Sequence, residues 1–313
     1  MGEHLPWVEK YRPSNISEIK GHVDIMKVLG KYQDISSMPH LIFYGPPGTG
    51  KTSTILAMAK KFYGDKLRSM VMEVNASDER GIDVVTGKIK SFVQTKSIVG
   101  PQIKLVLLDE ADALTAEAQS ALRRIIEKYT KTSRFCLCCN YSSKISTPIQ
   151  SRCTRFRFSG IDDVYLKEKI QEIKTAEKIL IEDSAIDAAV EVSNRDARRC
   201  INLLQSVYLG NHGVNITPDD VFKVAGVPLK KDIELISKSL LEDSFKESFT
   251  NIETISKSKG YAMTDIVTKL ASTLYCSNPM FMDELSNIEY NLAEGGSEVL
   301  AIGHLVSCFH IKS

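Results

Sequence analysis

Residues 45–52 read Gly45-Pro46-Pro47-Gly48-Thr49-Gly50-Lys51-Thr52, an uninterrupted match to the phosphate-binding loop, in which two spaced glycines are followed by Lys and then Ser or Thr. A short apolar run, 40–44, precedes the loop, and residues 53–62 after it are helix formers at helical spacing. Glycines let backbone N–H groups surround a phosphate, and a following helix directs the positive end of its dipole at the same anion. The stretch therefore predicts a strand, a loop and a helix that bind a nucleotide.

Two adjacent acids follow the next strongly apolar run, residues 103–108. A buried parallel strand has this pattern when its carboxyl end carries the chemistry. In the loop, Lys51 is expected to reach the terminal phosphates and Thr52 to hold Mg²⁺. We expect Asp109 to hold Mg²⁺ through water and Glu110 to polarise an attacking water. Adjacent acids are common on surfaces, but the loop upstream favours the catalytic interpretation.

Residues 134–140 form a further predicted strand, which ends in Asn140 at the edge where the nucleotide should lie. Asn140 either orients the water or the γ-phosphate, or it caps a turn, and the pattern leaves both open. Ser151-Arg152-Cys153 precedes the last strand, 154–158. Strands and helices alternate throughout residues 40–158, which indicates a parallel sheet covered by helices on both faces.

The amino-terminal segment places Trp7 between two prolines, Pro6 and Pro13, so a long helix is excluded there. Trp7 either forms a wall for an adenine, with Val8 and Tyr11 against the ring, or it closes the core. The sequence does not choose between these two uses.

After residue 160 the strand pattern stops and amphipathic helices follow, with a boundary at Gly226-Val227-Pro228. We expect an α/β nucleotide-binding domain at 1–158, a helical lid at 159–226 and an all-α oligomerisation collar at 227–313. A membrane span is not expected, because no apolar stretch approaches ~18 residues, and neither is a secretory signal. The seven cysteines are odd in number and do not form paired C-x-x-C motifs, so the sequence predicts neither a disulfide framework nor a zinc site.

Charge is divided unevenly over the 313 residues, although the net charge is only +1. Residues 1–158 hold 24 Lys and Arg against 15 Asp and Glu, hence +9, which leaves 16 against 24, hence −8, for the remainder. The basic half either lines a path for a polyanion or is one of two solvated faces of opposite sign.

Taken together, these motifs resemble an AAA+ ATPase of the clamp-loader group. The nucleotide motifs that carry this resemblance are 45–52, 109–112, 140 and 151–153. Residues 6–13, 75–83 and 121–124 resemble the small subunits of replication factor C, and 135–141 and 153–158 look most like its subunit 5 type, called subunit 3 in yeast.

The resemblance implies a nuclear hetero-pentamer that uses ATP and Mg²⁺ to open a sliding clamp, proliferating cell nuclear antigen, and to close it on primer–template DNA in replication and repair. It makes Asn140 sensor 1, Arg152 an arginine finger for the neighbouring subunit's site, and Arg198 a lid residue that touches the nucleotide. It also implies that Arg80 and Lys90 contact DNA. The expected ATP-binding residues are Val8, Tyr11, Arg12, Pro13, Gly45, Pro46, Pro47, Gly48, Thr49, Gly50, Lys51, Thr52, Ser53, Asn140 and Arg198.

Two positions depart from the family pattern. Arg195 stands where members usually have Gly before the aspartate of the sensor 2 motif, so the approach to that helix is expected to differ. Thr86 stands where an arginine generally contacts the DNA backbone. Lys90, four residues further and so on the same helix face, is expected to replace part of this contact.

Two rival interpretations remain. In the first, the chain is a ring scaffold that holds nucleotide and hydrolyses little, but intact Lys51, Asp109 and Glu110 favour hydrolysis. In the second, it is another AAA+ machine such as a branch-migration motor. Such a motor would lack Ser151-Arg152-Cys153 coupled to a collar of five helices. For Arg152 itself, a structural pairing with an acid between two strands is the alternative to an arginine finger.

Overall fold

The computed structural model describes residues 5–78, 81–95, 103–211, 214–274 and 280–310. The chain forms two compact units, one made of residues 1–178 and 193–202 and the other of residues 179–192 and 203–313. Each has its own hydrophobic core. The three-domain division predicted from the sequence stays a prediction.

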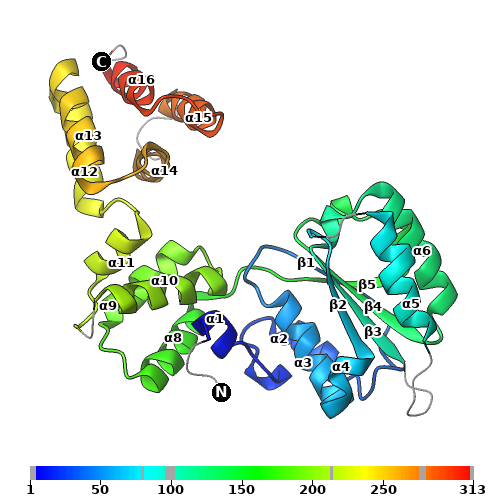
Figure 1. Cartoon of the computed structure of the whole chain (residues 1–313). Coiled ribbons are helices and arrows are strands. Elements are labelled where there is room, and N and C mark those ends of the chain that lie inside the picture. The colour runs from blue at the N-terminus through cyan, green and yellow to red at the C-terminus, as the bar shows by residue number, and fades with distance from the viewer. Residues whose placement is uncertain (1–4, 79–80, 96–102, 212–213, 275–279, 311–313) are drawn as a thin grey trace. The chain divides into compact units, whose positions relative to one another are not determined.

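A parallel sheet lies at the centre of the first unit, as the alternating pattern predicts (Figure 1). Its strand order is β2-β3-β4-β1-β5, and every pair of neighbours is parallel. The strands are β1 His40–Tyr44, β2 Val71–Asn75, β3 Lys104–Asp109, β4 Ser133–Cys139 and β5 Cys153–Arg157. Because all carboxyl ends of the strands lie at one edge, the sequence motifs that follow β1, β3 and β4 meet there.

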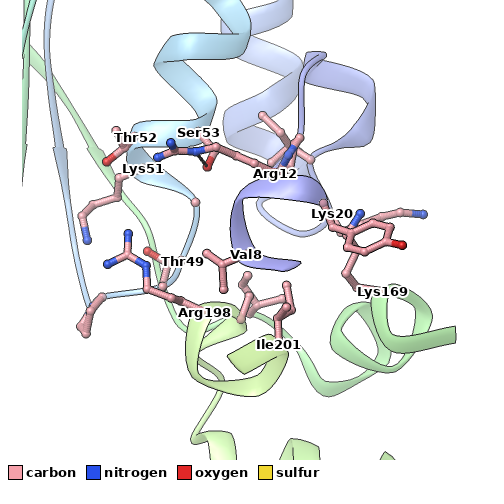
Figure 2. Close-up of a pocket in the computed structure, with 18 of the residues that line it drawn as sticks. Val8, Arg12, Lys20, Thr49, Lys51, Thr52, Ser53, Lys169, Arg198 and Ile201 are labelled. Carbon is pink, nitrogen blue, oxygen red and sulfur yellow. Dashed lines mark hydrogen bonds between the residues drawn. The ribbon is translucent and has the colours of Figure 1, made fainter. Parts of the chain in front are cut away.

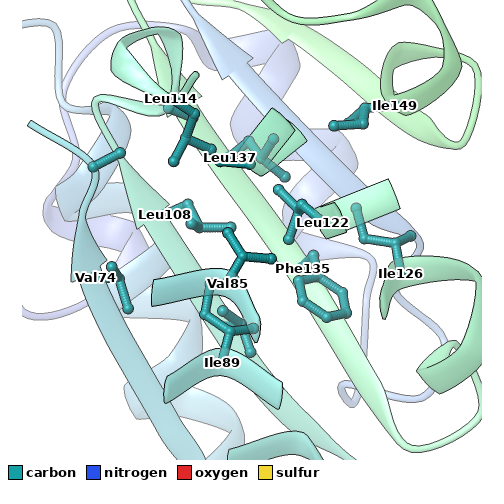
Figure 3. Close-up of a cluster of buried hydrophobic side chains, with 14 of the residues drawn as sticks. Val74, Val85, Ile89, Leu108, Leu114, Leu122, Ile126, Phe135, Leu137 and Ile149 are labelled. Carbon is teal, nitrogen blue, oxygen red and sulfur yellow. The ribbon is translucent and has the colours of Figure 1, made fainter. Parts of the chain in front are cut away.

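Helices cover both faces of this sheet. The helical elements of the first unit are α1 Trp7–Lys10, η1 Ile16–Glu18, α2 Val23–Gly30, α3 Lys51–Tyr63, η2 Gly64–Lys66, α4 Leu67–Met70, η3 Val84–Ile89, α5 Lys90–Gln94, η4 Ala111–Ala113, α6 Ala116–Tyr129, η5 Ser142–Lys144, α7 Thr147–Gln150, α8 Asp163–Glu177 and the start of α10, Ala197–Gly210. One core, with η3, α5 and α6, contains Val106 and Leu108 of β3 (Figure 3). The other, with α2, α3 and α4, contains Leu105 and Leu107. Strand β3 is thus buried on both sides, which explains its unbroken apolar run.

The helical segment after β2 contains a wide turn. Val84–Ile89 has π-helical hydrogen bonding, and an α-helix follows it at Lys90–Gln94. Three β-branched residues, Val84 to Thr86, fit an α-helix poorly, and the Thr86 hydroxyl donates to the carbonyl of Ile82 at 3.0 Å. A side-chain hydrogen bond of this kind competes with the backbone hydrogen bonds of the helix and widens one turn without ending the helix.

The second unit is helical. Its helices are α9 Asp183–Ser193, the rest of α10, α11 Pro218–Ala225, α12 Lys230–Glu242, α13 Phe245–Lys259, α14 Met263–Leu274, α15 Met280–Ala293 and α16 Glu298–His310. Among the described residues, the predicted collar at 227–313 contains the five expected helices, α12 to α16, and Thr217 and Asp220 form a capping box at the start of α11. Nowhere in the described ranges is a helix both long and apolar enough to cross a bilayer.

His40, at the start of β1, is a buried titratable group. Its Nδ1 accepts from the Phe135 backbone N–H at 3.2 Å, so its Nε2 carries the proton and lies 3.3 Å from the Thr130 hydroxyl. Burial lowers the pKa of His40 from 6.5 to about 4, and the nearby Arg134 adds to this effect. The imidazole is therefore neutral in the folded chain at physiological pH.

We expect this histidine to make the fold acid-sensitive. Below pH 6.5 the unfolded chain protonates His40 and the folded chain does not until about pH 4, so stability falls across that window and then levels off. At about 1.4 kcal/mol per pKa unit, the loss approaches about 3 kcal/mol. The measurement is urea unfolding of wild type and His40→Gln at pH 7, 5.5 and 4. Parallel pH dependence in the two proteins would rule this out.

Candidate active site

An open cavity lies at the carboxyl edge of the sheet, within the first unit (Figure 2). It encloses about 1250 Å³ including its open mouth, which is ample for a nucleotide. The predicted site residues that line it are Val8, Tyr11, Arg12, Pro13, Pro47, Gly48, Thr49, Gly50, Lys51, Thr52, Ser53, Asp109, Glu110, Asn140 and Arg198. Segments up to 190 residues apart in the sequence therefore surround one space.

The loop between β1 and α3 presents the amino end of a helix to this cavity. Gly50 precedes α3 with φ 89°, a left-handed conformation that glycine adopts without strain. No side chain caps the helix. Its first-turn N–H groups are therefore available to an anion, and the helix dipole favours negative charge there.

Lys51 is buried and bound to the loop that precedes it. Its ammonium donates to the carbonyls of Gly45 at 2.8 Å and Pro46 at 2.7 Å, and to Oδ1 of Asn140 at 3.2 Å. Desolvation lowers the pKa of Lys51, while nearby groups including Asp109 act in the opposite direction. The lysine is thus held beside the α3 terminus, where a phosphate would be its strongest partner.

The two predicted Mg²⁺ ligands are in contact. The Thr52 hydroxyl donates to Oδ2 of Asp109 at 2.8 Å, which joins the start of α3 to the end of β3. Mg²⁺ prefers oxygen ligands and is usually held by one or two protein groups, with waters and phosphates completing the octahedron. A hydroxyl and a carboxylate at this edge fit that requirement.

Glu110 has a strained backbone. Its φ is 51° although it is not glycine, and its N–H donates to Oδ1 of Asp109 at 3.0 Å. Residues held in this region cluster at functional sites, because the surrounding structure must compensate for the strain. The exposed side chain lines the cavity one residue beyond Asp109.

Asp112 is a positioning residue to which the sequence pattern assigns no role. Its Oδ2 accepts from the backbone N–H groups of Asn140 and Tyr141, both at 3.2 Å. It thereby fixes the end of β4, and the Asn140 side chain faces Lys51. The signal available in the sequence was its position, three residues after Asp109.

The amino-terminal segment forms another wall. Val8, Tyr11, Arg12 and Pro13 line the cavity, whereas Trp7 is buried and is not among the lining residues. This arrangement favours the core-closing role of Trp7. Burial, and then the hydrogen bond that Tyr11 donates to Glu177, raise the pKa of Tyr11 to about 12, so its hydroxyl stays protonated.

The start of α10 forms a further wall of the cavity. Arg195 has φ 65°, the left-handed conformation that glycine favours. The expected change of approach to the helix stays a prediction. The Ala197 N–H donates to the Gly48 carbonyl at 3.2 Å, and Arg198 points to the same side of the cavity as Lys51 (Figure 2).

Gly48 is the tightest point of this junction. A Cβ there would lie 1.6 Å from Oδ1 of Asp196, the same oxygen that caps α10 by accepting from the Arg199 N–H at 3.0 Å. Gly50 also has positive φ, but a Cβ there would meet nothing within 4 Å. An alanine at Gly48 would therefore suffer both a steric clash and backbone strain, whereas an alanine at Gly50 would suffer backbone strain alone.

We expect Gly48→Ala to destabilise the nucleotide-free chain by about 1–2 kcal/mol more than Gly50→Ala, because Asp196 must leave its cap position. Denaturant unfolding without nucleotide measures this difference. Adding Asp196→Ala to Gly48→Ala should cost little more, since both changes remove the same contact. Equal destabilisation by the two glycine variants would show that the Asp196 contact is unimportant.

Several predicted residues lie outside the cavity lining. Gly45 and Pro46 accept hydrogen bonds from the Lys51 ammonium through their backbone carbonyls. A Cβ on Gly45 would lie 1.8 Å from the carbonyl oxygen of Phe158. Lys90 is exposed on α5. Arg80 lies outside the described residues.

Arg152 also lies outside the cavity lining. Its Nη2 is 2.6 Å from Oε1 of Glu127 on α6, and its Nη1 donates to the Pro148 carbonyl at 2.6 Å. The side chain of Arg152 is 38% exposed. Its bound partner is thus an acid on a helix, and its position leaves it open to a second molecule.

Part of the cavity lining was not predicted from the sequence. These lining residues are Glu9, Glu18, Ile19, Lys20, Cys139, Ile161, Tyr165, Leu166, Lys169, Ala197 and Ile201. Most come from η1, α8 and α10, whose patterns show only ordinary amphipathic helices. No local signal identified them.

Two family models match the chain. Residues 41–161 match the model of the ATPase family associated with various cellular activities (AAA), and residues 228–308 match that of the replication factor C C-terminal domain. The first match covers the sheet, and the second covers most of helices α12–α16.

Curated relatives extend over nearly the whole chain. "Probable replication factor C subunit 5" of Dictyostelium discoideum is 46% identical, covering 99% of this chain and 92% of its own length. "Replication factor C subunit 5" of Homo sapiens is 42% identical, covering 98% and 92%. "Replication factor C subunit 3" of Saccharomyces cerevisiae is 41% identical, covering 95% and 90%.

Among solved structures, the Thermotoga maritima RuvB Holliday junction branch migration motor is similar with a TM-score of 0.56 over 80% of this chain and 86% of that one. At 18% identity this likeness shows the AAA+ fold alone. The branch-migration alternative therefore gains nothing from it, and the predicted resemblance is confirmed by the relatives above. The chain belongs to the replication factor C subunit family, in the group named subunit 5 or subunit 3.

Proposed function

We propose that this chain is an ATP-hydrolysing subunit of a nuclear, hetero-pentameric clamp loader, which loads proliferating cell nuclear antigen onto primer–template DNA during replication and repair. One observation carries the catalytic part: Lys51, Thr52, Asp109 and Asn140 converge by direct contacts at the amino end of α3. Phosphoryl transfer relies on positioning and electrostatic stabilisation, which is what such a cluster supplies.

Each group has a role that its contacts support. Lys51 exchanges its bonds to loop carbonyls for the terminal phosphates, while α3 binds the phosphate chain through its free N–H groups. Thr52 and Asp109 would hold Mg²⁺, whose positive charge would offset the negative charge of the phosphates. Glu110 polarises the attacking water, and Asn140, fixed by Asp112, orients it. Val8, Tyr11, Arg12 and Pro13 receive the adenine, and Arg198 approaches the phosphates from α10.

Completion of the site requires a neighbour. Arg152 is outside its own cavity, and its ion pair with Glu127 is partly exposed, so the pair contributes at most about 1 kcal/mol. A phosphoryl group across a subunit junction would bind the Arg152 guanidinium more strongly than Glu127 does. We therefore assign Arg152 to the adjacent subunit's site.

DNA contact is proposed for Arg80 and for the exposed Lys90, supported by the +9 balance of residues 1–158. The contacts would be with backbone phosphates and therefore independent of sequence. The substitution that tests this contact is Lys90→Ala in the assembled clamp loader. It should reduce the salt dependence of primer–template binding by about one phosphate contact, and an unchanged salt slope would remove Lys90 from the interface.

The test of the proposed function compares the purified chain with the complex reconstituted from its partner subunits. We expect little ATPase activity from the chain alone and stimulation by partners and primer–template DNA, since a neighbour's arginine is worth roughly 10³–10⁵ in rate. Full turnover by the isolated chain, unchanged by partners and DNA, would refute it. If the reconstituted site binds ATP and does not turn over, the scaffold alternative is correct.

A further inference from the structure

The second unit holds a group of metal-ligating side chains that the proposed function does not use. Glu284 on α15 and His304 and Cys308 on α16 each offer one ligand atom, and these three atoms lie within 4.8 Å of one another. The His304 Nε2 and Glu284 Oε2 atoms are 3.3 Å apart. A thiol, an imidazole and a carboxylate thus converge between two helices.

The fold brings these groups together for identifiable reasons. His304 and Cys308 are four residues apart on α16, so both side chains project from one helix face. A short turn that contains Gly295, at φ 91°, joins α15 to α16, so that the two helices pack side by side. The rings of Phe281 and Phe309 stack at 4.3 Å and 8° between the same two helices. Packing therefore fixes the helix pair before any ion binds.

The chemistry of the three ligands favours one class of metal. Thiolate with imidazole selects Zn²⁺ and similar borderline ions over Mg²⁺ or Ca²⁺, which prefer oxygen ligands only. Tetrahedral bonds of about 2.0–2.3 Å place neighbouring ligand atoms roughly 3.3–3.8 Å apart, a spacing that the Glu284 and His304 atoms already have. The side chains of Glu284 and His304 are partly exposed to solvent.

We propose that Glu284, His304 and Cys308 bind a Zn²⁺ ion that links α15 to α16, with water in the fourth position. Cys308 is only 7% exposed, so its sulfur is sheltered, while Glu284 and His304, at 32% and 39%, leave a path for the ion. Metal binding to the folded state would stabilise the second unit. The predicted Mg²⁺ ligands, Thr52 and Asp109, belong to the first unit.

The experiment uses the untagged, reduced full-length chain without nucleotide, titrated with Co²⁺ as a spectroscopic probe of Zn²⁺ sites. We expect one equivalent to produce a thiolate-to-cobalt charge-transfer band, which Zn²⁺ then abolishes by displacement. Oxygen-only sites such as Thr52 and Asp109 cannot give this band. No saturable band in the wild type would overturn the proposal, whatever the variants do.

Variants then locate the site. Cys308→Ser should lose the band, whereas Cys153→Ser, which removes a half-buried thiol from β5 of the other unit, should keep it. Because Cys308 lies in a core, Glu284→Gln serves as the milder change, and we expect it to weaken binding by more than about tenfold and to reduce the rise in Tm caused by Zn²⁺. A band that survives in Cys308→Ser, or unaltered affinity in Glu284→Gln, would show that the metal binds elsewhere.

Discussion

Arg152→Ala should slow ATP hydrolysis at the adjacent subunit by roughly 10³–10⁵-fold and leave the affinity of its own chain for ATP unchanged. In the proposed role, the guanidinium of Arg152 would stabilise charge that spreads over the transferring phosphoryl oxygens. It does not line the cavity of its own chain and is held at an exposed position by Glu127. The measurement is single-turnover hydrolysis in complexes in which one site at a time is competent.

Glu127→Gln provides the matched control. It removes the ion pair of Arg152 but keeps the guanidinium, so hydrolysis at the neighbouring site should be nearly unchanged. If Arg152 had only the structural role of pairing with an acid, the two variants would have similar effects. A loss that mapped to this chain's own Lys51 site would contradict the assignment in trans.

Glu110→Gln should lower hydrolysis at this chain's own site by about 10²–10⁴-fold, with ATP affinity retained within a few fold. The amide fills the same space but cannot polarise water. Lys51→Ala should instead weaken ATP binding itself, because it removes a phosphate contact. It also leaves the Gly45 and Pro46 carbonyls and Asn140 without their lysine partner, so the nucleotide-free chain should lose stability as well.

Titration with a fluorescent ATP analogue, followed by single-turnover hydrolysis in the complex, separates the two variants. Glu117→Gln, a change to an exposed acid in the first turn of α6, is the control for a general loss of negative charge. Equal loss of nucleotide affinity in Glu110→Gln and Lys51→Ala would show that Glu110 binds rather than catalyses.

The parallel sheet could be predicted because its signals are local. The unbroken apolar run of β3 reports burial on both faces, and the loop at 45–52 reports a strand-to-helix turn around a phosphate. Once parallel strands are accepted, geometry requires Lys51, Asp109 and Asn140 to meet at one edge. The collar helices were equally readable, because Gly260 and Gly295 punctuate a clear helical period.

Contacts between distant segments could not be predicted in this way. The sequence carries no sign that Asp196 packs against Gly48, that Asp112 holds the end of β4, or that Arg152 pairs with Glu127. The wide turn at Val84–Ile89 likewise resembles an ordinary helix in its hydrophobic pattern.

By itself, the sequence determined the main strands and helices of this protein and the family to which it belongs. Only the tertiary structure decided which helices close the cavity and which side chains share a partner, and it alone brought Glu284 to His304 and Cys308. The physical reason is that periodicity records which face of an element is apolar, whereas the neighbour of that face is chosen by packing of the whole unit.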